Sequence, residues 1–187
     1  MRETIKKIID ESIEAKKNIP ADLVEEACVN IISRFKKGGQ LLVCGNGGSA
    51  ADAQHMAGEF VNKFKMERNP ASCIALTTDT SIMTAISNDY GFDEVFSKQV
   101  KAYGRENDVL VGISTSGNSK NVIRAVEAAK EKGIYTIGLL GGDGGKMKVC
   151  CDLPIVVKSN DTPRIQESHI LIIHAICEIV EKALFSS

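Results

Sequence analysis

Five short apolar runs, separated by segments with helical spacing, restrict this chain to a small set of folds. Their apolar residues are continuous rather than alternating, which indicates strands buried on both faces. Strands that alternate with helices pair in parallel, with helices on each side of the sheet. The sequence therefore predicts an α/β three-layer sandwich with a five-stranded parallel sheet. The expected strands are QLLVC (40–44), SCIAL (72–76), DVLVGI (108–113), YTIGLL (135–140) and DLPIVVK (152–158).

The helical segments complete the expected layout. Apolar stripes at 5–13 and 23–35 lie on either side of Pro20 and predict an N-terminal helical hairpin over residues 1–38. At 187 residues the chain fits one domain, so we expect residues 39–187 to form a single α/β core with a long C-terminal helix. Further helices are predicted over 50–65, 80–88, 92–103 after a break at 88–91, 119–133, and from about Pro163 onwards.

Composition argues against several classes of protein. The formal net charge is −1 and no long run of one sign occurs, which disfavours nucleic acid binding. The N-terminus lacks the apolar centre of a signal peptide, and no segment is apolar over the thickness of a bilayer. The 6 cysteines form no Cys-x-x-Cys pair, so neither disulfides nor a thiolate zinc site is expected. We therefore expect a cytoplasmic protein without a membrane or nucleic acid partner.

Two polar loops follow the first and third expected strands, GNGGS (45–49) and STSGNS (114–119). The carboxyl ends of parallel strands share one edge, where such folds bind ligands. The second loop opens a helix, whose free amides and dipole favour an anion. One hydroxyl is enough for an ordinary helix cap, and this loop has several. It therefore predicts a phosphate site made of Ser114, Thr115, Ser116 and Ser119.

Two nucleotide-binding motifs are the alternatives for these loops. The Walker sequence, in which Gly and four further residues precede Gly-Lys-Ser/Thr, does not occur in the chain. GNGGSA (45–50) matches the dinucleotide pattern G-x-G-x-x-G/A, but its acidic partner would be Asp79, well beyond the usual spacing of about 20 residues. A dinucleotide is therefore the less favoured interpretation.

Candidate acid–base groups follow the glycine-rich loop and open the last helix. His55 and Glu59 are four residues apart on one helical face, which suits metal ligation, an acid–base pair or a solvated surface pair. Gln166 and His174 are eight residues apart, about 12 Å along a helix, so one helix would have difficulty aiming both at one small site. Copies from neighbouring subunits would do so more easily. His169 is interpreted as structural.

The last helix is apolar around most of its circumference, in IQESHILIIHAICEIVEKALF (165–185). A helix that is apolar on most faces is buried on most faces. We therefore expect it to pack against another subunit, with burial inside one chain as the alternative. The GGDGG loop (141–145) is either a turn or a further approach to the site.

Taken in order, GNGGS, AQHMAGEF, SNDYGF, GISTSGNSKNVI, DGGKM and RIQESHILIIH resemble the phosphoheptose isomerases, which belong to the sugar isomerase (SIS) domain family. The resemblance covers nearly the whole chain, and the motifs together are highly specific. It implies a flavodoxin-like sheet and a homotetramer with sites at subunit interfaces. It also implies an aldose–ketose isomerase that converts D-sedoheptulose 7-phosphate to D-glycero-D-manno-heptose 7-phosphate through a cis-enediol, the first step of activated heptose biosynthesis.

The same resemblance suggests a role for each matching residue. Glu59 looks like the catalytic base and His174 like the acid. His55, Glu59, Gln166 and His174 are similar to the zinc ligands of the family, with one ion per subunit. The implied substrate contacts are Asn46, Gly47, Gly48, Glu59, Asn88, Asp89, Ser114, Thr115, Ser116, Ser119 and Gln166.

Three alternatives remain open. A relative of the same fold binds the bacterial replication initiator without catalysis, but its pattern lacks an acid matching Glu59 and a histidine matching His174. A sugar-phosphate-sensing regulatory domain would need a partner domain, for which 187 residues leave no room. Another isomerase of the family, acting on a hexose or pentose phosphate, is the third; the His-x-x-x-Glu and Gln-Glu-x-His runs favour a heptose.

Overall fold

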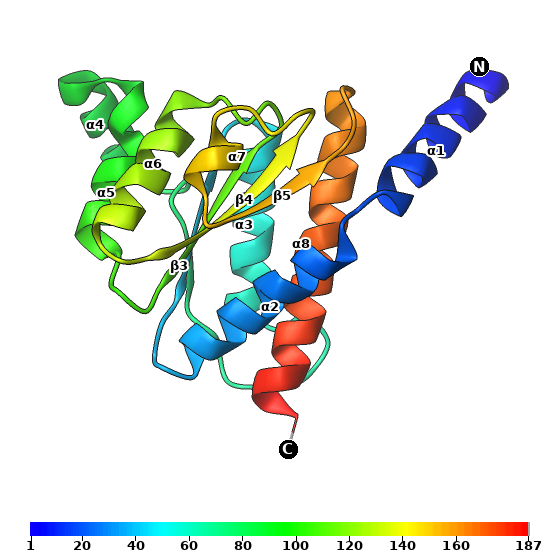
Figure 1. Cartoon of the computed structure of the whole chain (residues 1–187). Coiled ribbons are helices and arrows are strands. Elements are labelled where there is room, and N and C mark those ends of the chain that lie inside the picture. Colours follow the sequence, from blue (N-terminus) through cyan, green and yellow to red (C-terminus); the bar gives the residue numbers. More distant parts are fainter. Residues whose placement is uncertain (187) are drawn as a thin grey trace.

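The computed structural model describes residues 1–186 and contains a five-stranded parallel sheet (Figure 1). The strands lie in the order β2-β1-β3-β4-β5, which is the flavodoxin-like arrangement. The predicted parallel sheet is therefore confirmed, with all five strands within two residues of their expected positions. Their bounds are β1 Leu41–Gly45, β2 Cys73–Ala75, β3 Val109–Ser114, β4 Tyr135–Gly141 and β5 Leu153–Val157.

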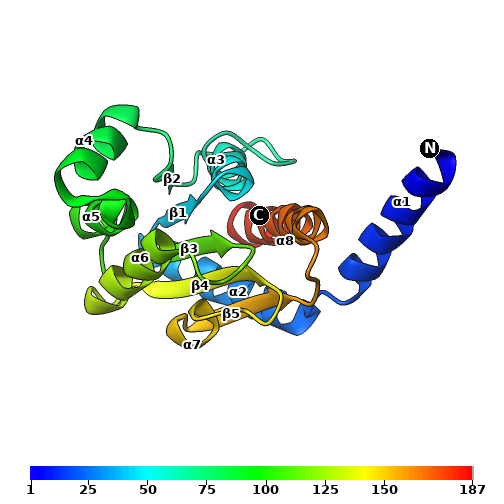
Figure 2. The same cartoon turned by 90° about the horizontal axis from the view of Figure 1, so that it is seen from above.

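Helices cover both faces of the sheet, which makes three layers (Figure 2). Successive residues of a strand point to opposite faces, and β1 divides its side chains accordingly. Leu41 and Val43 pack with α2 (Ala21–Phe35), α3 (Gly48–Val61) and α8 (Thr162–Phe185). Leu42 and Cys44 pack with α5 (Val95–Tyr103) and α6 (Lys120–Glu131). The helices are α1 Arg2–Lys17, α2 Ala21–Phe35, α3 Gly48–Val61, α4 Thr80–Tyr90, α5 Val95–Tyr103, α6 Lys120–Glu131, α7 Met147–Cys150 and α8 Thr162–Phe185, with a 3-10 turn at Phe92–Glu94.

The two N-terminal helices are present, but they are splayed rather than packed as a closed hairpin. Both views show α1 leading away from the body of the molecule, while α2 lies beside α8 (Figures 1 and 2). Pro20, between them, has an extended backbone (φ −74°, ψ 90°) that redirects the chain. The apolar stripe that would seal a hairpin remains half exposed at Ile5 and Ile9.

The helix before the predicted break is longer than expected. The sequence suggested a break over 88–91, but α4 continues to Tyr90 and ends at Gly91. Gly91 has a φ of 91°, a conformation that L side chains rarely adopt, so glycine is favoured at the end of this helix.

Most of α8 is buried within its own chain. Ile172, Ile173 and Ile176 are covered by the sheet, α2 and α3, whereas Leu171 and Ile179 remain exposed. Burial inside one chain, which was the alternative interpretation, therefore accounts for most of the apolar surface of α8. A narrower stripe stays uncovered. Among residues 1–186, no helix is both long enough and apolar enough to cross a membrane.

Candidate functional site

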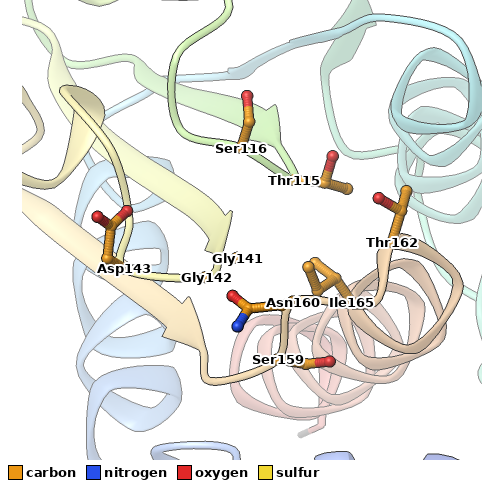
Figure 3. A pocket seen from close by; sticks show the side chains of 9 residues that line it. All are labelled: Thr115, Ser116, Gly141, Gly142, Asp143, Ser159, Asn160, Thr162 and Ile165. Carbon is orange, nitrogen blue, oxygen red and sulfur yellow. The ribbon is translucent and has the colours of Figure 1, made fainter.

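The two polar loops meet at the carboxyl edge of the sheet, as the sequence predicted. We name residues 45–49 the glycine loop and residues 114–119 the hydroxyl loop. Their strands β1 and β3 are paired neighbours, so the loops leave the sheet side by side. A cavity of about 380 Å³ opens at this edge, beyond the ends of β3, β4 and β5 (Figure 3). It is lined by Thr115, Ser116, Gly141, Gly142, Asp143, Ser159, Asn160, Thr162 and Ile165.

The hydroxyl loop presents only part of its oxygen atoms to this cavity. Thr115 and Ser116 line it, whereas the hydroxyls of Ser114 and Ser119 share a hydrogen bond of 2.9 Å. Ser119 occupies the N-cap position of α6, yet its side chain makes no capping bond there. An ordinary helix cap therefore does not explain these hydroxyls, and the Ser114–Ser119 bond fixes the two ends of the loop to each other.

The GGDGG loop supports the hydroxyl loop from the other side. Gly117 has a φ of 63°, and a Cβ added there would lie 1.9 Å from the carbonyl oxygen of Gly144. The Asn118 side chain bridges the two loops, because its Nδ2 donates to the Ser116 carbonyl at 2.8 Å and its Oδ1 accepts from the Lys146 N–H at 3.1 Å. Both loops therefore need glycine where they approach each other most closely. The GGDGG loop is thus not only a turn, because it supports the hydroxyl loop.

The glycine loop leads directly into α3. Gly47 adopts a φ of 55° at the N-cap position of that helix. A Cβ added at Gly48 would lie 2.3 Å from Nε2 of Gln166, so Gln166 packs against the first turn of α3. Asn46 faces Asn121 of α6, with two hydrogen bonds of 2.9 Å between their side chains. This part of the site thus joins the beginnings of three helices.

The candidate acid–base groups converge between α3 and α8. Nε2 of His55 lies 3.0 Å from Nε2 of His174 and 3.1 Å from Oε1 of Glu59. Donor atoms from these three residues all lie within 4.8 Å of one another. The group forms inside one chain, so Glu59 and His174 come together without a residue from a neighbouring subunit. The reason is that α3 and α8 pack side by side in the same direction.

The donor atoms of this trio fit a zinc ion. Zinc accepts imidazole nitrogen and carboxylate oxygen, and two ligand atoms about 2.0–2.1 Å from a tetrahedral ion lie about 3.4 Å apart. The distances of 3.0 and 3.1 Å around His55 are close to that value. A single hydrogen on His55 Nε2 would have to serve both neighbours, whereas a cation at the centre would be attractive to all three lone pairs.

A short loop closes one side of the trio. The ring of Phe64 lies 5.5 Å from that of His174, centroid to centroid. The carboxylate of Glu181 holds this loop in place by accepting backbone N–H groups from Phe64, Lys65 and Met66 at 2.7–3.0 Å. Arg68 donates to the same carboxylate at 3.0 Å and to the carbonyl oxygen of Glu59 at 2.8 Å. The loop is therefore tied to the helices that carry Glu59 and His174.

Two buried groups near the trio have shifted pKa values. Burial, followed by the charges of Glu59 and Glu181, raises the pKa of Cys177 to about 12, so its thiol stays neutral. Burial acts to raise the pKa of Glu181, but the three backbone N–H groups and Arg68 outweigh it and lower the pKa overall. The negative charge beside the trio is thus a permanent one at neutral pH.

His169 lies apart from this group and has a structural contact. Its ring is fully buried, and Nε2 donates to the carbonyl oxygen of Leu140 at 3.0 Å. Burial lowers the pKa of His169 to about 4, against the smaller effect of this hydrogen bond. The contact ties α8 to the end of β4, where the cavity opens, which agrees with the structural interpretation of His169.

Three predicted site residues lie away from the places expected for them. Asn88 and Asp89 are exposed at the end of α4, where they bond to each other at 2.8 Å, and they do not line the cavity. Gln166 lies against Gly48, about 12 Å along α8 from His174. The described chain therefore brings together three of the four predicted zinc ligands.

One wall of the cavity was not predicted from the sequence. Ser159, Asn160 and Thr162, in the loop from β5 to α8, contribute polar side chains there (Figure 3). The signal was available, because SNDTP (159–163) also follows a parallel strand and contains several polar residues.

The chain matches a recognised family of proteins. A family model described as SIS domain matches residues 3–141, which is most of the chain. The chain belongs to the SIS domain family.

Relatives within that family are similar over nearly their full lengths. The phosphoheptose isomerase of Clostridium acetobutylicum is 52% identical over 190 residues, covering 99% of this chain and 97% of that protein. The phosphoheptose isomerase of Citrifermentans bemidjiense is 60% identical over 162 residues, covering 87% and 84%. Among solved structures, the phosphoheptose isomerase of Neisseria gonorrhoeae superposes with a TM-score of 0.90 at 48% identity, covering 97% of this chain and 98% of that one. Within the SIS family, the chain belongs to the phosphoheptose isomerases.

Proposed function

We propose that this protein is an aldose–ketose isomerase that converts D-sedoheptulose 7-phosphate to D-glycero-D-manno-heptose 7-phosphate. The observation that carries the proposal is the convergence of Glu59 and His174 from two helices of one chain. Family membership supports the same reaction. The product is the starting compound for activated heptose, and the whole chain acts as a single SIS domain.

Isomerisation moves one proton between two carbons and one between two oxygens. Glu59 removes a proton from C1 of the open-chain ketose, which gives a cis-enediol, and a proton returns to C2. His174 acts as the acid that protonates the C2 oxygen, while the C1 hydroxyl gives up its proton to form the aldehyde. Atoms and charges therefore balance without an added reactant. Two side chains that contact the same small volume are what this exchange requires.

The phosphate end of the sugar is anchored at the carboxyl edge of the sheet. Thr115 and Ser116 offer hydroxyls to the cavity, and the first turn of α6 supplies free amides and the positive end of a helix dipole. Ser114 and Ser119 would complete this cradle by holding the two ends of the loop through the hydrogen bond between their hydroxyls. Anchoring one end limits the motion of the other end, so the reactive carbons stay beside Glu59.

The other predicted contacts lie between the two ends. Asn46, Gly47 and Gly48 form the start of α3, and Gln166 packs against them. We assign these residues to the middle of the sugar.

One zinc ion per subunit is part of the proposal. His55, Glu59 and His174 would hold it, with Gln166 as the fourth predicted ligand. When bound, zinc would polarise the sugar carbonyl and stabilise negative charge on oxygen.

The proposed assembly is a homotetramer with sites at subunit interfaces, in the cytoplasm. The exposed apolar residues support self-association: Ile5, Ile8, Ile9, Ile13, Leu171 and Ile179 are each more than two-fifths exposed. A groove of about 640 Å³ between the N-terminal helices and α8 adds to this surface. Asn88 and Asp89 would contact substrate from a neighbouring copy, since they lie away from the cavity of their own chain.

The direct test is incubation with sedoheptulose 7-phosphate and detection of the aldose 7-phosphate, with and without a chelator. Unphosphorylated sedoheptulose is the matched control, because it lacks only the anchored group. We expect conversion of the phosphate ester and far slower conversion of the free sugar. Absence of conversion in both the metal-loaded and the chelated protein would contradict the proposal.

A further inference from the structure

A pair of asparagine side chains connects the glycine loop to the first turn of α6. Nδ2 of Asn46 donates to Oδ1 of Asn121 at 2.9 Å, and Nδ2 of Asn121 donates to Oδ1 of Asn46 at 2.9 Å. The two residues are 75 positions apart in the chain. Each amide is thus both donor and acceptor to the other, a geometry that fixes distance and orientation together.

Asn121 is hidden from solvent, and its side chain makes a further hydrogen bond. It is 3% exposed, and its Oδ1 also accepts the N–H of Val122 at 3.0 Å. Breaking this pair would leave buried polar groups without partners, which costs more than the net value of the hydrogen bonds themselves. A position occupied in this way is suited to holding two segments in register.

The pairing changes what Asn46 can do. One N–H and one lone pair on its side chain are used by Asn121, and the other N–H and lone pair remain available to a sugar. Asn46 therefore also places the glycine loop, in addition to its proposed contact with the sugar. That loop begins α3, which carries His55 and Glu59.

We infer that Asn121 is a positioning residue that acts through Asn46 and sets the separation between the phosphate anchor and the acid–base groups. The inference rests on the proposed isomerase function. The hydroxyl loop follows β3 and opens α6, whereas the trio belongs to α3 and α8. The Asn46–Asn121 pair is a direct side-chain connection between α6 and the start of α3, so it decides where Glu59 lies relative to a bound phosphate.

The phosphate anchor has its own supports, which makes the two ends separable. The Ser114–Ser119 bond and the Asn118 bridge to Lys146 hold the hydroxyl loop without Asn121. Loss of the asparagine pair should therefore disturb catalysis on the sugar much more than binding of a simple anion.

The experiment compares Asn46→Ala, Asn121→Ala and the double variant in the complete protein. For each we would measure kcat and KM for sedoheptulose 7-phosphate, the inhibition constant of inorganic phosphate, and the melting temperature. Asn30→Ala is the matched control, because its side chain bonds only within its own helix, to Glu26. Asn121→Ser is the second variant if Asn121→Ala folds poorly; its hydroxyl can accept the Val122 N–H but is too short to reach Asn46.

We expect Asn121→Ala to lower kcat/KM about tenfold or more while the phosphate inhibition constant changes less than about twofold. The double variant should resemble Asn46→Ala alone, because both changes remove the same connection. The inference is overturned if the two single effects multiply, or if phosphate inhibition weakens as much as kcat/KM.

The role of the Asn46–Asn121 pair can be tested even if the proposed reaction is wrong. If the wild-type protein does not isomerise the sugar, the proposed function fails. Calorimetric titration of the same variants with sedoheptulose 7-phosphate and with inorganic phosphate then tests the role of the Asn46–Asn121 pair. Selective weakening of sugar phosphate binding supports it, and equal weakening of both ligands overturns it.

Discussion

Nε2 of His174 lies 3.0 Å from Nε2 of His55, although the two residues are 119 positions apart in the chain. The contact follows from similar spacings between residues on two neighbouring helices, α3 and α8. Gly48 lies against Gln166, and His55, seven residues later, meets His174, eight residues after Gln166. Helices α3 and α8 therefore run side by side in the same direction, and each passes from the carboxyl edge of the sheet to the acid–base trio.

The first prediction concerns the proposed base. Glu59→Gln keeps the size and polarity of the side chain but cannot accept a proton from carbon. We expect turnover of sedoheptulose 7-phosphate to fall by at least about a hundredfold with binding largely retained. Isomerisation assays and calorimetric titration with the substrate would measure the two effects.

Glu67→Gln is the control for this substitution, since Glu67 is exposed and pairs only with Lys63. It should leave turnover near the wild-type value. Near-normal activity of Glu59→Gln would exclude Glu59 as the base.

The second prediction concerns metal. Zinc titration of the chelator-treated protein should show one site per chain, because His55, Glu59 and His174 supply convergent nitrogen and oxygen donors. His55→Ala and His174→Ala should each weaken zinc binding at least about tenfold. His169→Gln should not, because His169 lies apart and bonds to Leu140. Equal zinc affinity in all three variants would refute a site at the trio.

The third prediction is a loss of stability in acid through His169. Burial lowers its pKa to about 4 in the folded protein. Between pH 6.5 and 4 the unfolded chain therefore binds a proton at this side chain, whereas the folded chain does not. Stability from this group is complete above pH 6.5 and is lost as the pH falls towards 4, by about 3 kcal/mol in total.

Denaturant unfolding at several pH values would test this prediction against His169→Gln. Glutamine keeps an N–H for the Leu140 carbonyl and does not titrate. The difference in unfolding free energy between the two proteins should therefore shrink as the pH falls from 6.5 to 4. A constant difference over that range would assign the acid sensitivity to other groups.

The fourth prediction concerns the buried ion pair behind the trio. The side chains of Arg68 and Glu181 are 3% and 2% exposed. Glu181→Gln would leave the Arg68 guanidinium without a countercharge, which costs about 3–5 kcal/mol in comparable cases. The loop that holds Phe64 against His174 should loosen, so kcat should fall as well. Urea unfolding and kinetics would measure both.

Glu178→Gln is the matched control one turn earlier on α8. Its carboxylate pairs with Lys65 and Lys182 at the surface, so its removal should change the unfolding free energy little. If both variants unfolded at the same denaturant concentration, the buried pair would have no special role.

The fifth prediction concerns assembly. Ile9→Asp and Ile13→Asp place charge on the exposed apolar face of α1 and should reduce the oligomer to smaller species in light scattering. Lys7→Asp, on the same helix, changes charge without touching that face and should leave the assembly intact. Unchanged mass in all three variants would show that α1 takes no part in association.

The local pattern of the sequence was a good guide to the sheet and its ligand edge. Continuous apolar runs such as DVLVGI have few alternatives to a buried parallel strand, and β3 starts at Val109 and pairs with β1 and β4. The hydroxyl loop was predicted at the correct edge for the same reason. The spacing of His55 and Glu59 also indicated correctly that they share one face of a helix.

The sequence was a poorer guide wherever distant segments meet. It indicated no partner for Asn46, because Asn121 looked like an ordinary helix residue. It gave no indication that Glu59 and His174 would meet in one chain, because helical spacing along α8 says nothing about the direction of α3. The same limit applies to α1. Its apolar stripe predicted half of a helical hairpin, but the extended backbone at Pro20 directs α1 away from α2.

The amino-acid sequence by itself thus determined the order of strands and helices, the parallel sheet and the position of its two polar loops, since these depend on the periodicity of neighbouring residues. Only the tertiary structure decided which side chains share a site. The reason is physical: the packing of α3 on α8 and the asparagine pair between the glycine loop and α6 arise from contacts across 75 to 119 residues, which no local period encodes.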